Sequence, residues 1–481
     1  MKTFCLVRSA LCLSALIPAM VSSAGYFFWT GEKDNVFETL TNEGNWKYDN
    51  NSDQGANASY NFSGKALKDH AVLFNDSAVP FSERFNESGR RVEFPKKYTL
   101  TQKLEVRGGS LESPIIFASS GDSTNGIASS SDFRFASGCC VKALSGYYSF
   151  NQILPLNGVF ENAGGDFSAT ELLIGSRYGL SNSAVINNGN ITISGDIKLD
   201  STTNNSGTHD QVNVVTNLGG TVRATNLYIG RKDGTNLNKS YVGHVAVDGG
   251  LMSFSGKVYL GSKGTKSCAV YLNGGTFETK GIRRSDGSDN FVLFNGGALR
   301  AAQGQTNDDP LLDTSAVYLL VGENGGTIDT AGQRVVLKRS LESALASGKD
   351  GGMTFTGGGE VHVDYFGDTT QVDGYKGGLM YSGPTKITPG TTVWTVNRRL
   401  SGTVATEGLV CKLTKETYKD GVYTLFELDA SKNDTFTEAD LARCRVEPAD
   451  LASSVKFKLS EDAKSILAEV KVKRYFKLII R

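Results

Sequence analysis

The stretch that decides the fold contains three related segments: NLGGTVRATNLYIG (residues 217–230), DGGLMSFSGKVYLG (residues 248–261) and NGGTFETKGIRR (residues 273–284). Each opens with Asn or Asp close to a glycine pair, which permits the positive φ angles of a sharp corner. An alternation of apolar and polar residues follows, with the period of two that is typical of β-strands. This alternation places Val222, Val245 and Val247 on one face.

The same unit recurs along the chain. Related segments begin at Asn162, Asn188, Asn295 and Asn324, so that glycine corners follow one another at intervals of about 22–30 residues. A unit of such short strands cannot enclose a core, but units stacked about 4.8 Å apart bury one continuous apolar column. We therefore predict an all-β fold, a right-handed parallel β-helix (solenoid), with repeats over residues 96–400.

The sequence on either side of the repeats predicts two further modules. Residues 25–95 are expected to form an N-terminal β capping module, and residues 401–481 a C-terminal β-rich module. Helix signals are few: residues 340–347 predict one short helix, and a second is predicted to begin near Thr437.

The first 24 residues have the pattern of a secretory signal peptide. Lys2 and Arg8 precede an apolar run, and small residues come before Gly25. The run is shorter than the ~20 residues that span a bilayer, so we predict cleavage rather than anchoring. The mature protein is then expected to be secreted or at the cell surface (extracellular or periplasmic), with no transmembrane segment. Lys+Arg 50 balances Asp+Glu 50, which argues against a nucleic-acid partner.

Loss of the signal peptide leaves an odd number of cysteines. Cys139 and Cys140 are adjacent and Cys268 is isolated, whereas Cys411 and Cys444 share one C-terminal segment. Cys411 and Cys444 are a candidate disulfide. The alternative is that most cysteines are buried as small apolar residues. No Cys-x-x-Cys spacing occurs, so we predict neither a metal site nor a cofactor.

Three polar residues on one predicted strand are candidate binding residues. Because Val361 and Val363 turn inward, Glu360, His362 and Asp364 share the outer face. Such a set could bind a metal or take part in acid–base chemistry, but a solvated strand face has the same pattern.

The aromatic residues Trp29 and Trp46 have two interpretations. They could stack against sugar rings, or they could cover the apolar end of the solenoid.

An enzymatic interpretation would need paired carboxylates, or a basic residue beside them, gathered in one place. The obvious candidates are Asp308 with Asp309, and Arg283 and Arg284 with Asp286. Charged residues in turns produce the same pattern, so no catalytic residue is assigned.

The repeats resemble the autotransporter-associated β-strand repeat proteins of bacteria. The resemblance rests on the Asn-Gly-Gly-Thr corners, on GGGEVHVD (residues 357–364) and on LMYSGPTKITPGT (residues 379–391), although residues 367–376 interrupt the repeat. It implies a passenger-type surface protein of bacteria. We therefore expect a non-catalytic structural or adhesin-like protein that contacts glycans or proteins. The alternative is a carbohydrate-active enzyme, a polysaccharide lyase or hydrolase, on the same scaffold.

Overall fold

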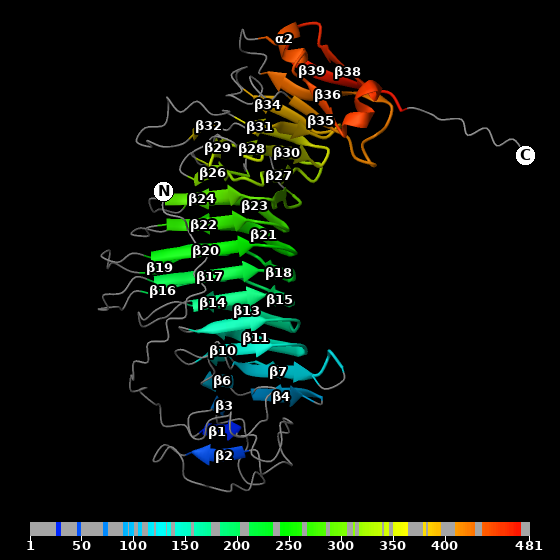
Figure 1. Ribbon diagram of the computed structural model, residues 1–481. Helices are drawn as coiled ribbons and strands as arrows, with labels where there is room; N and C mark the ends of the chain where they lie inside the picture. The colour runs from blue at the N-terminus through cyan, green and yellow to red at the C-terminus, as the bar shows by residue number, and fades with distance from the viewer. Residues whose placement is uncertain are drawn as a thin grey trace, which may run out of the picture. The chain divides into compact units, whose positions relative to one another are not determined.

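A computed structural model of the chain confirms the parallel β-solenoid, with about eight turns and very little helix in its described residues (Figure 1). The structure describes residues 26–29, 46–49, 71–75, 90–94, 96–100, 104–107, 114–119, 122–130, 132–135, 140–154, 158–174, 183–202, 211–233, 241–261, 267–284, 289–304, 311–312, 317–338, 341–345, 350–363, 379–380, 383–395, 409–428 and 435–472. The predicted signal peptide lies outside these residues. No helix within them has the length and apolarity to cross a membrane.

Internal contacts divide the chain into two compact units. Unit 1 comprises residues 1–216, 220–222 and 232–240, and unit 2 comprises residues 217–219, 223–231 and 241–481. Three strands have residues in both: β17 (Gln211–Asn217), β18 (Thr221–Ala224) and β19 (Leu227–Asp233).

Unit 1 is built from short strands that pair in parallel, apart from the antiparallel pair β1–β2. Its strands are β1 (Tyr26–Trp29), β2 (Trp46–Asp49), β3 (Ala71–Asn75), β4 (Arg90–Phe94), β5 (Lys97–Leu100), β6 (Leu104–Arg107), β7 (Ile115–Ser119), β8 (Gly126–Ser129), β9 (Phe133–Phe135), β10 (Cys140–Ala143), β11 (Tyr147–Leu154), β12 (Val159–Asn162), β13 (Asp166–Ile174), β14 (Ser183–Asn187), β15 (Asn190–Ile193) and β16 (Ile197–Thr202).

Stacked aromatic side chains fill the interior of unit 1. The rings of Tyr148 and Phe167, on β11 and β13, lie 4.5 Å apart, and those of Phe133 and Phe150 lie 4.7 Å apart. The Tyr148 hydroxyl donates to the carbonyl oxygen of Ser145 at 2.8 Å, and burial raises its pKa. Parallel register places equivalent side chains above one another, and offset rings pack well at this spacing.

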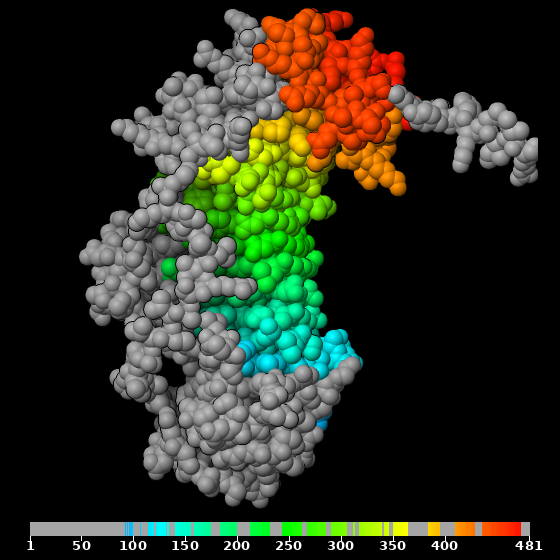
Figure 2. All heavy atoms as spheres, in the orientation of Figure 1, coloured from blue at the N-terminus to red at the C-terminus, as the bar shows by residue number. Residues whose placement is uncertain are grey.

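Unit 2 continues with the strands β20 (Tyr241–Val247), β21 (Leu251–Leu260), β22 (Ser267–Leu272), β23 (Thr276–Arg284), β24 (Asp289–Phe294), β25 (Ala298–Ala301), β26 (Val317–Val321), β27 (Gly326–Asp329), β28 (Arg334–Leu337), β29 (Leu341–Ser343), β30 (Met353–Thr356), β31 (Glu360–Val363), β32 (Leu379–Met380), β33 (Thr385–Ile387), β34 (Thr392–Thr395) and β35 (Leu409–Lys412). Most pair in parallel with the equivalent strand one turn on. Their side chains form a continuous packed surface from β20 to β31 (Figure 2, green to yellow).

The apolar column of unit 2 follows from this register. Val247 pairs with Leu272, Leu272 with Phe294, and Phe294 with Val321. All four are fully buried, as are Val245 and its partner Val270. The strand alternation read from the sequence is therefore confirmed.

Glycine at the corners is required by sterics as well as by backbone conformation. Gly275 has φ +58, and a Cβ on it would lie 2.5 Å from the carbonyl carbon of Gly249 in the adjacent turn. An L-residue would thus meet both a left-handed strain and a backbone clash. Corner glycines therefore allow successive turns to stack closely.

Asparagine occupies two different positions at these corners. Asn162 and Asn187 of unit 1 are fully buried, and the amide nitrogen of Asn162 donates to the Asn187 side-chain oxygen at 2.9 Å. In unit 2, Asn273 is outside the column and donates to Asp248 at 2.8 Å. The corner motif is therefore shifted by one residue between these turns.

The C-terminal part changes from parallel to antiparallel pairing. Its elements are β36 (Gly421–Leu428), α2 (Glu438–Leu441), β37 (Arg445–Glu447), the 3₁₀ helix η5 (Ala449–Ser454), β38 (Val455–Leu459) and β39 (Ser465–Val470). Strand β36 pairs in parallel with β34, but β39 is antiparallel to both β36 and β38. The roles of residues 25–95 and 401–481 as capping and β-rich modules stay predictions.

One helix prediction is confirmed and the other is wrong. Helix α2 begins after Thr437, whose backbone N–H donates to Asp440 at 2.8 Å. Residues 341–343 of the other predicted helix form strand β29, which pairs with β26. The buried strand pairing overrides the local helix preference of this segment.

Candidate functional site

The candidate site lies on the outer face of four adjacent parallel strands: β28, β31, β34 and β36. Their inward residues pair in one row and are fully buried: Val335, Val361, Val393 and Phe426. Because side chains alternate along a strand, the residues next to these point outward. The inner row therefore fixes which side chains share the outer face.

Glu360 and His362 are in contact on this face, as their spacing predicts. His362 Nε2 lies 2.9 Å from Glu360 Oε2, and His362 Nδ1 lies 3.5 Å from Arg334 Nη2. A guanidinium group can only donate, so Nδ1 accepts and Nε2–H donates to Glu360. Arg334 Nε is also 3.9 Å from Glu360 Oε2. These contacts hold the His362 imidazole between a carboxylate and a guanidinium.

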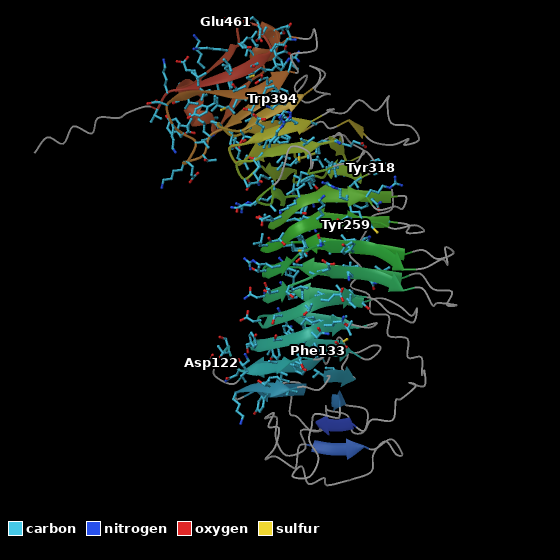
Figure 3. The ribbon with its side chains drawn as sticks, turned by 180° about the vertical axis from the view of Figure 1, so that it is seen from behind. Asp122, Phe133, Tyr259, Tyr318, Trp394 and Glu461 are labelled. Carbon is cyan, nitrogen blue, oxygen red and sulfur yellow. The ribbon has the colours of Figure 1, made fainter. Side chains whose placement is uncertain are left out.

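Trp394 adds an aromatic surface to the site. It pairs with His362 in register, and the two rings stack at 5.4 Å with an interplanar angle of 4°. Trp394 belongs to the yellow strands in Figure 3. Its Nε1 atom is buried and has no hydrogen-bond partner among the described residues.

Glu427 is the next residue in register after Trp394. Partial burial raises the pKa of its carboxyl group, and the like charges of Asp462 and Glu360 raise it further. Within the described part of the chain, its carboxylate makes no hydrogen bond or ion pair. Glu427 is therefore a carboxylate on this face with no counter-ion among the residues that the structure describes.

The remaining candidate binding residues are less well defined. Asp364 lies outside the described residues. Trp29 and Trp46 pair directly with each other across β1 and β2, but their side chains are not among those described. The choice between sugar stacking and end covering for these two residues stays a prediction.

Of the enzymatic candidates named from sequence, Arg283 and Arg284 lie within the described residues. Arg283 is buried, its guanidinium packs over Gly281, and it donates to the carbonyl of Ile282 at 3.1 Å. Asp286, Asp308 and Asp309 lie outside the described residues. No group of three or more His, Cys, Asp or Glu able to hold a metal ion occurs in the described ranges.

Cys411 and Cys444 are free thiols, so the candidate disulfide is not formed in the structure. In register Cys411 lies opposite Val446 rather than Cys444. Burial raises the pKa of both thiols to about 12, and for Cys444 the charges of Asp440 and Cys411 add to the rise. Cys140, Cys268 and Cys411 are buried, so among the described cysteines the alternative that most are core residues is confirmed.

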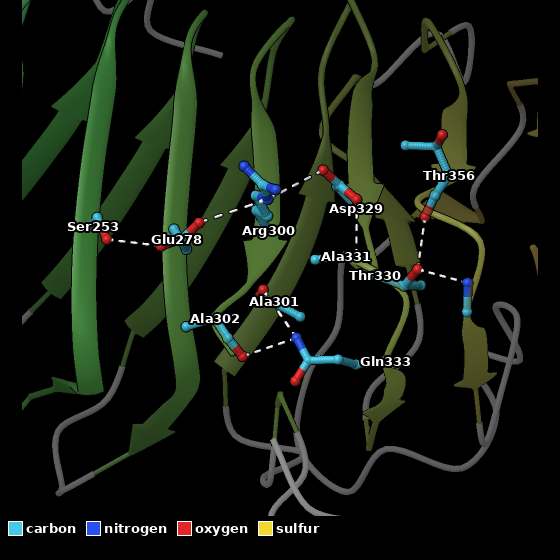
Figure 4. A network of polar contacts seen from close by, with 11 residues as sticks. Ser253, Glu278, Arg300, Ala301, Ala302, Asp329, Thr330, Ala331, Gln333 and Thr356 are labelled. Atoms are coloured by element: carbon cyan, nitrogen blue, oxygen red, sulfur yellow. Dashed lines mark hydrogen bonds and ion pairs between the residues drawn. The ribbon is translucent and has the colours of Figure 1, made fainter. Parts of the chain in front are cut away.

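A second polar network, on β21, β23, β25 and β27, provides a comparison for the site (Figure 4). Ser253 donates to Glu278 at 2.8 Å, and Arg300 Nε lies 3.6 Å from Glu278 and 3.4 Å from Asp329. Each carboxylate here has a partner on the adjacent turn. Both carboxylates of this network lie beside Arg300, whereas Glu427 makes no ion pair among the described residues.

Sequence reasoning missed Arg334, Trp394 and Glu427 as members of the site. Arg334 lies one turn before Glu360, Trp394 one turn after His362, and Glu427 one turn after Trp394. The separations differ, because Arg334 precedes Glu360 by 26 residues and Trp394 follows His362 by 32. Chain inserted between the turns hides this equivalence. An alignment of the alternating valines, Val335, Val361 and Val393, could have found it.

Comparison of the chain with protein-family models, curated proteins and solved structures finds no match.

Proposed function

We propose that the chain is an exported bacterial β-solenoid with a non-catalytic structural or adhesin-like role, secreted or at the cell surface, where it contacts glycans or proteins. Three observations support the proposal: the signal-like residues 1–24, the resemblance of the corners to autotransporter-associated repeats, and the parallel solenoid itself. A long repetitive sheet presents side chains at fixed spacing, which suits extended partners.

The observation that carries the proposal is the outer face around the stacked His362 and Trp394. In a parallel ladder the rings stack on each other along the solenoid axis, so their edges point outward. Arg334 and Glu360 supply hydrogen-bonding groups beside these edges, with side chains 43% and 47% exposed. Apolar edges flanked by polar groups match the mixed surface of a sugar chain.

A binding experiment tests the proposal. Residues 25–481 would be applied to an array of glycans and extracellular-matrix proteins, beside the variant Trp394→Ala. The variant Tyr259→Ala is the matched control, because Tyr228 and Tyr259 form another outward ring stack, 4.8 Å apart. We expect binding that Trp394→Ala weakens and Tyr259→Ala does not. Absence of any bound ligand would refute the proposal.

One observation favours a second candidate function, a carbohydrate-active enzyme. Glu360, Glu427 and Asp462 are close enough to interact electrostatically, and Glu427 has the raised pKa expected of a proton donor. Assay of residues 25–481 against polysaccharides would test it. Turnover abolished by Glu427→Gln and by Glu360→Gln would favour this function, whereas no turnover on any substrate would leave the binding role.

A further inference from the structure

Among the described residues on the outer face of β28, β31, β34 and β36, the Glu427 carboxylate has no ion-pair partner. Arg334 and His362 are both engaged with Glu360. Glu427 then faces the like charges of Glu360 and Asp462, and Lys464 acts on Asp462. The carboxylate of Glu427 is therefore the group on this face that a positively charged ligand would compensate.

Beside Glu427, Trp394 supplies a second polar group that has no hydrogen-bond partner among the described residues. Its indole N–H is buried without an acceptor in the described part of the chain, and a buried donor without a partner is unfavourable. Glu427 is the register neighbour of Trp394, so the two side chains leave adjacent strands at the same level of the outer face. Contact of a ligand with the indole N–H requires the groups that cover it to move aside. The pair thus offers one donor and one anionic acceptor at adjacent positions.

We infer that this face binds a sugar carrying a free amino group, with the ammonium on Glu427 and a neighbouring hydroxyl oxygen accepting from the Trp394 N–H. The inference rests on the proposed glycan-binding function and names its ligand class. A 2-amino-2-deoxy sugar has an ammonium and a hydroxyl group on adjacent carbons, which matches the two unmatched groups. His362 is held by Glu360 and Arg334, and so it keeps the Trp394 ring in place.

The same charges disfavour acidic and N-acetylated glycans. A uronic acid would bring a third negative charge close to Glu427 and Glu360, and like charges in partly desolvated positions repel. Acetylation removes the ammonium charge and leaves Glu427 uncompensated. The face therefore discriminates by charge, and its binding should weaken as salt is raised.

The test compares three oligosaccharides of equal length: glucosamine, N-acetylglucosamine and galacturonic acid oligomers. Titration calorimetry on residues 25–481 should give the tightest binding with glucosamine. Loss of one charge-assisted contact in Glu427→Gln should weaken that binding about tenfold. The matched control is Glu278→Gln, which removes an equal charge from an outward ladder where Arg300 is the partner.

The outcomes separate this inference from the proposed function. Equal binding of the glucosamine and N-acetylglucosamine oligomers, or unchanged affinity in Glu427→Gln, overturns the inference and leaves glycan binding standing. Failure of all three oligomers overturns the inference, and the proposed function falls only if the wider array is also negative. Equal weakening by Glu278→Gln would trace the effect to net charge and also overturn the inference. Circular dichroism of both variants verifies that they fold.

Discussion

Asn162 is the residue whose replacement tests the solenoid most directly. Its amide nitrogen donates to Gly165 O at 2.9 Å, to Asn187 Oδ1 at 2.9 Å and to Asn190 O at 3.2 Å, and its oxygen accepts from Gly165 N at 2.8 Å. The side chain is fully buried and joins two turns of unit 1. We predict that Asn162→Ala destabilises the protein far more than removal of an outward corner amide.

The size of this destabilisation depends on which hydrogen-bonding groups lose their partner in Asn162→Ala. Gly165 O keeps the backbone N–H of Asn190, and Asn187 Oδ1 keeps the N–H of Gly189. The Gly165 N–H loses its acceptor, which costs about 1–3 kcal/mol, and the weakened contacts add to this. We expect a loss of about 3 kcal/mol. For Asn273→Ala, which removes one exposed bond to Asp248, we expect about 0.5 kcal/mol.

Urea unfolding followed by far-UV circular dichroism measures both variants, and hydrogen exchange at Gly165 gives a local readout. Protection of the Gly165 amide should fall in Asn162→Ala and stay unchanged in Asn273→Ala. Because repeat arrays can unfold in more than one step, the comparison uses the transition of the turn that carries the substitution. Equal destabilisation by the two variants would refute the reasoning, since it would mean that inward and outward corner amides are equivalent.

Four further predictions concern other parts of the chain. Because the pKa values of Cys411 and Cys444 are raised to about 12, only a fraction of about 10⁻⁴ of each thiol should be ionised at pH 8. Both should therefore resist a thiol reagent until urea unfolds the chain, and rapid labelling of the folded protein would contradict this. Ala331 has φ 48, so Ala331→Gly should relieve left-handed strain and stabilise the protein by about 0.5 kcal/mol in urea unfolding, whereas a loss would show that the strain is absent. The pKa of Glu427 is higher in the folded protein than in the unfolded chain. Its contribution to stability is therefore present at low pH and is lost as pH rises through the folded-state pKa. Glu427→Gln should raise the melting temperature at pH 7 and change it little below pH 4. Phe436 is 2% exposed and packs edge-on against Phe426 at 5.9 Å, so Phe436→Ala should cost about 3 kcal/mol in the same unfolding assay, and a cost near zero would show that this contact is not part of the core.

The fold could be predicted because one local signal repeats. A glycine corner and a short alternating strand constrain the chain wherever they occur. At Gly275, both the positive φ and the close approach of the adjacent turn require glycine. The segment at residues 340–347 was misread because its pattern of apolar residues also suits a helix. Pairing of β29 with β26 decides its structure, and that pairing lies outside the local sequence.

The site could be predicted only in part, because its residues come from several turns of the solenoid. Glu360 and His362 lie two residues apart on one strand, so alternation alone places them on one face. Arg334, Trp394 and Glu427 reach the same face from other turns, and turn length varies too much for spacing to align them. Register is set by the buried valines, and it becomes visible only when the turns are stacked.

The solenoid itself explains why Glu427 is the informative exception. Stacking brings each outward side chain within about 5 Å of the strand in the next turn, so a charge on one turn needs an opposite or polar neighbour on the next. The Glu278–Arg300–Asp329 ladder and the Lys142–Glu161 pair follow this rule. Glu427 makes no ion pair among the described residues, and its register neighbours are the ring of Trp394 and the hydroxyl side chain of Ser465. The like charges of Asp462 and Glu360 raise its pKa further. Residues that depart from the regular pattern of a fold are concentrated at functional sites. The binding experiments are therefore directed at Glu427.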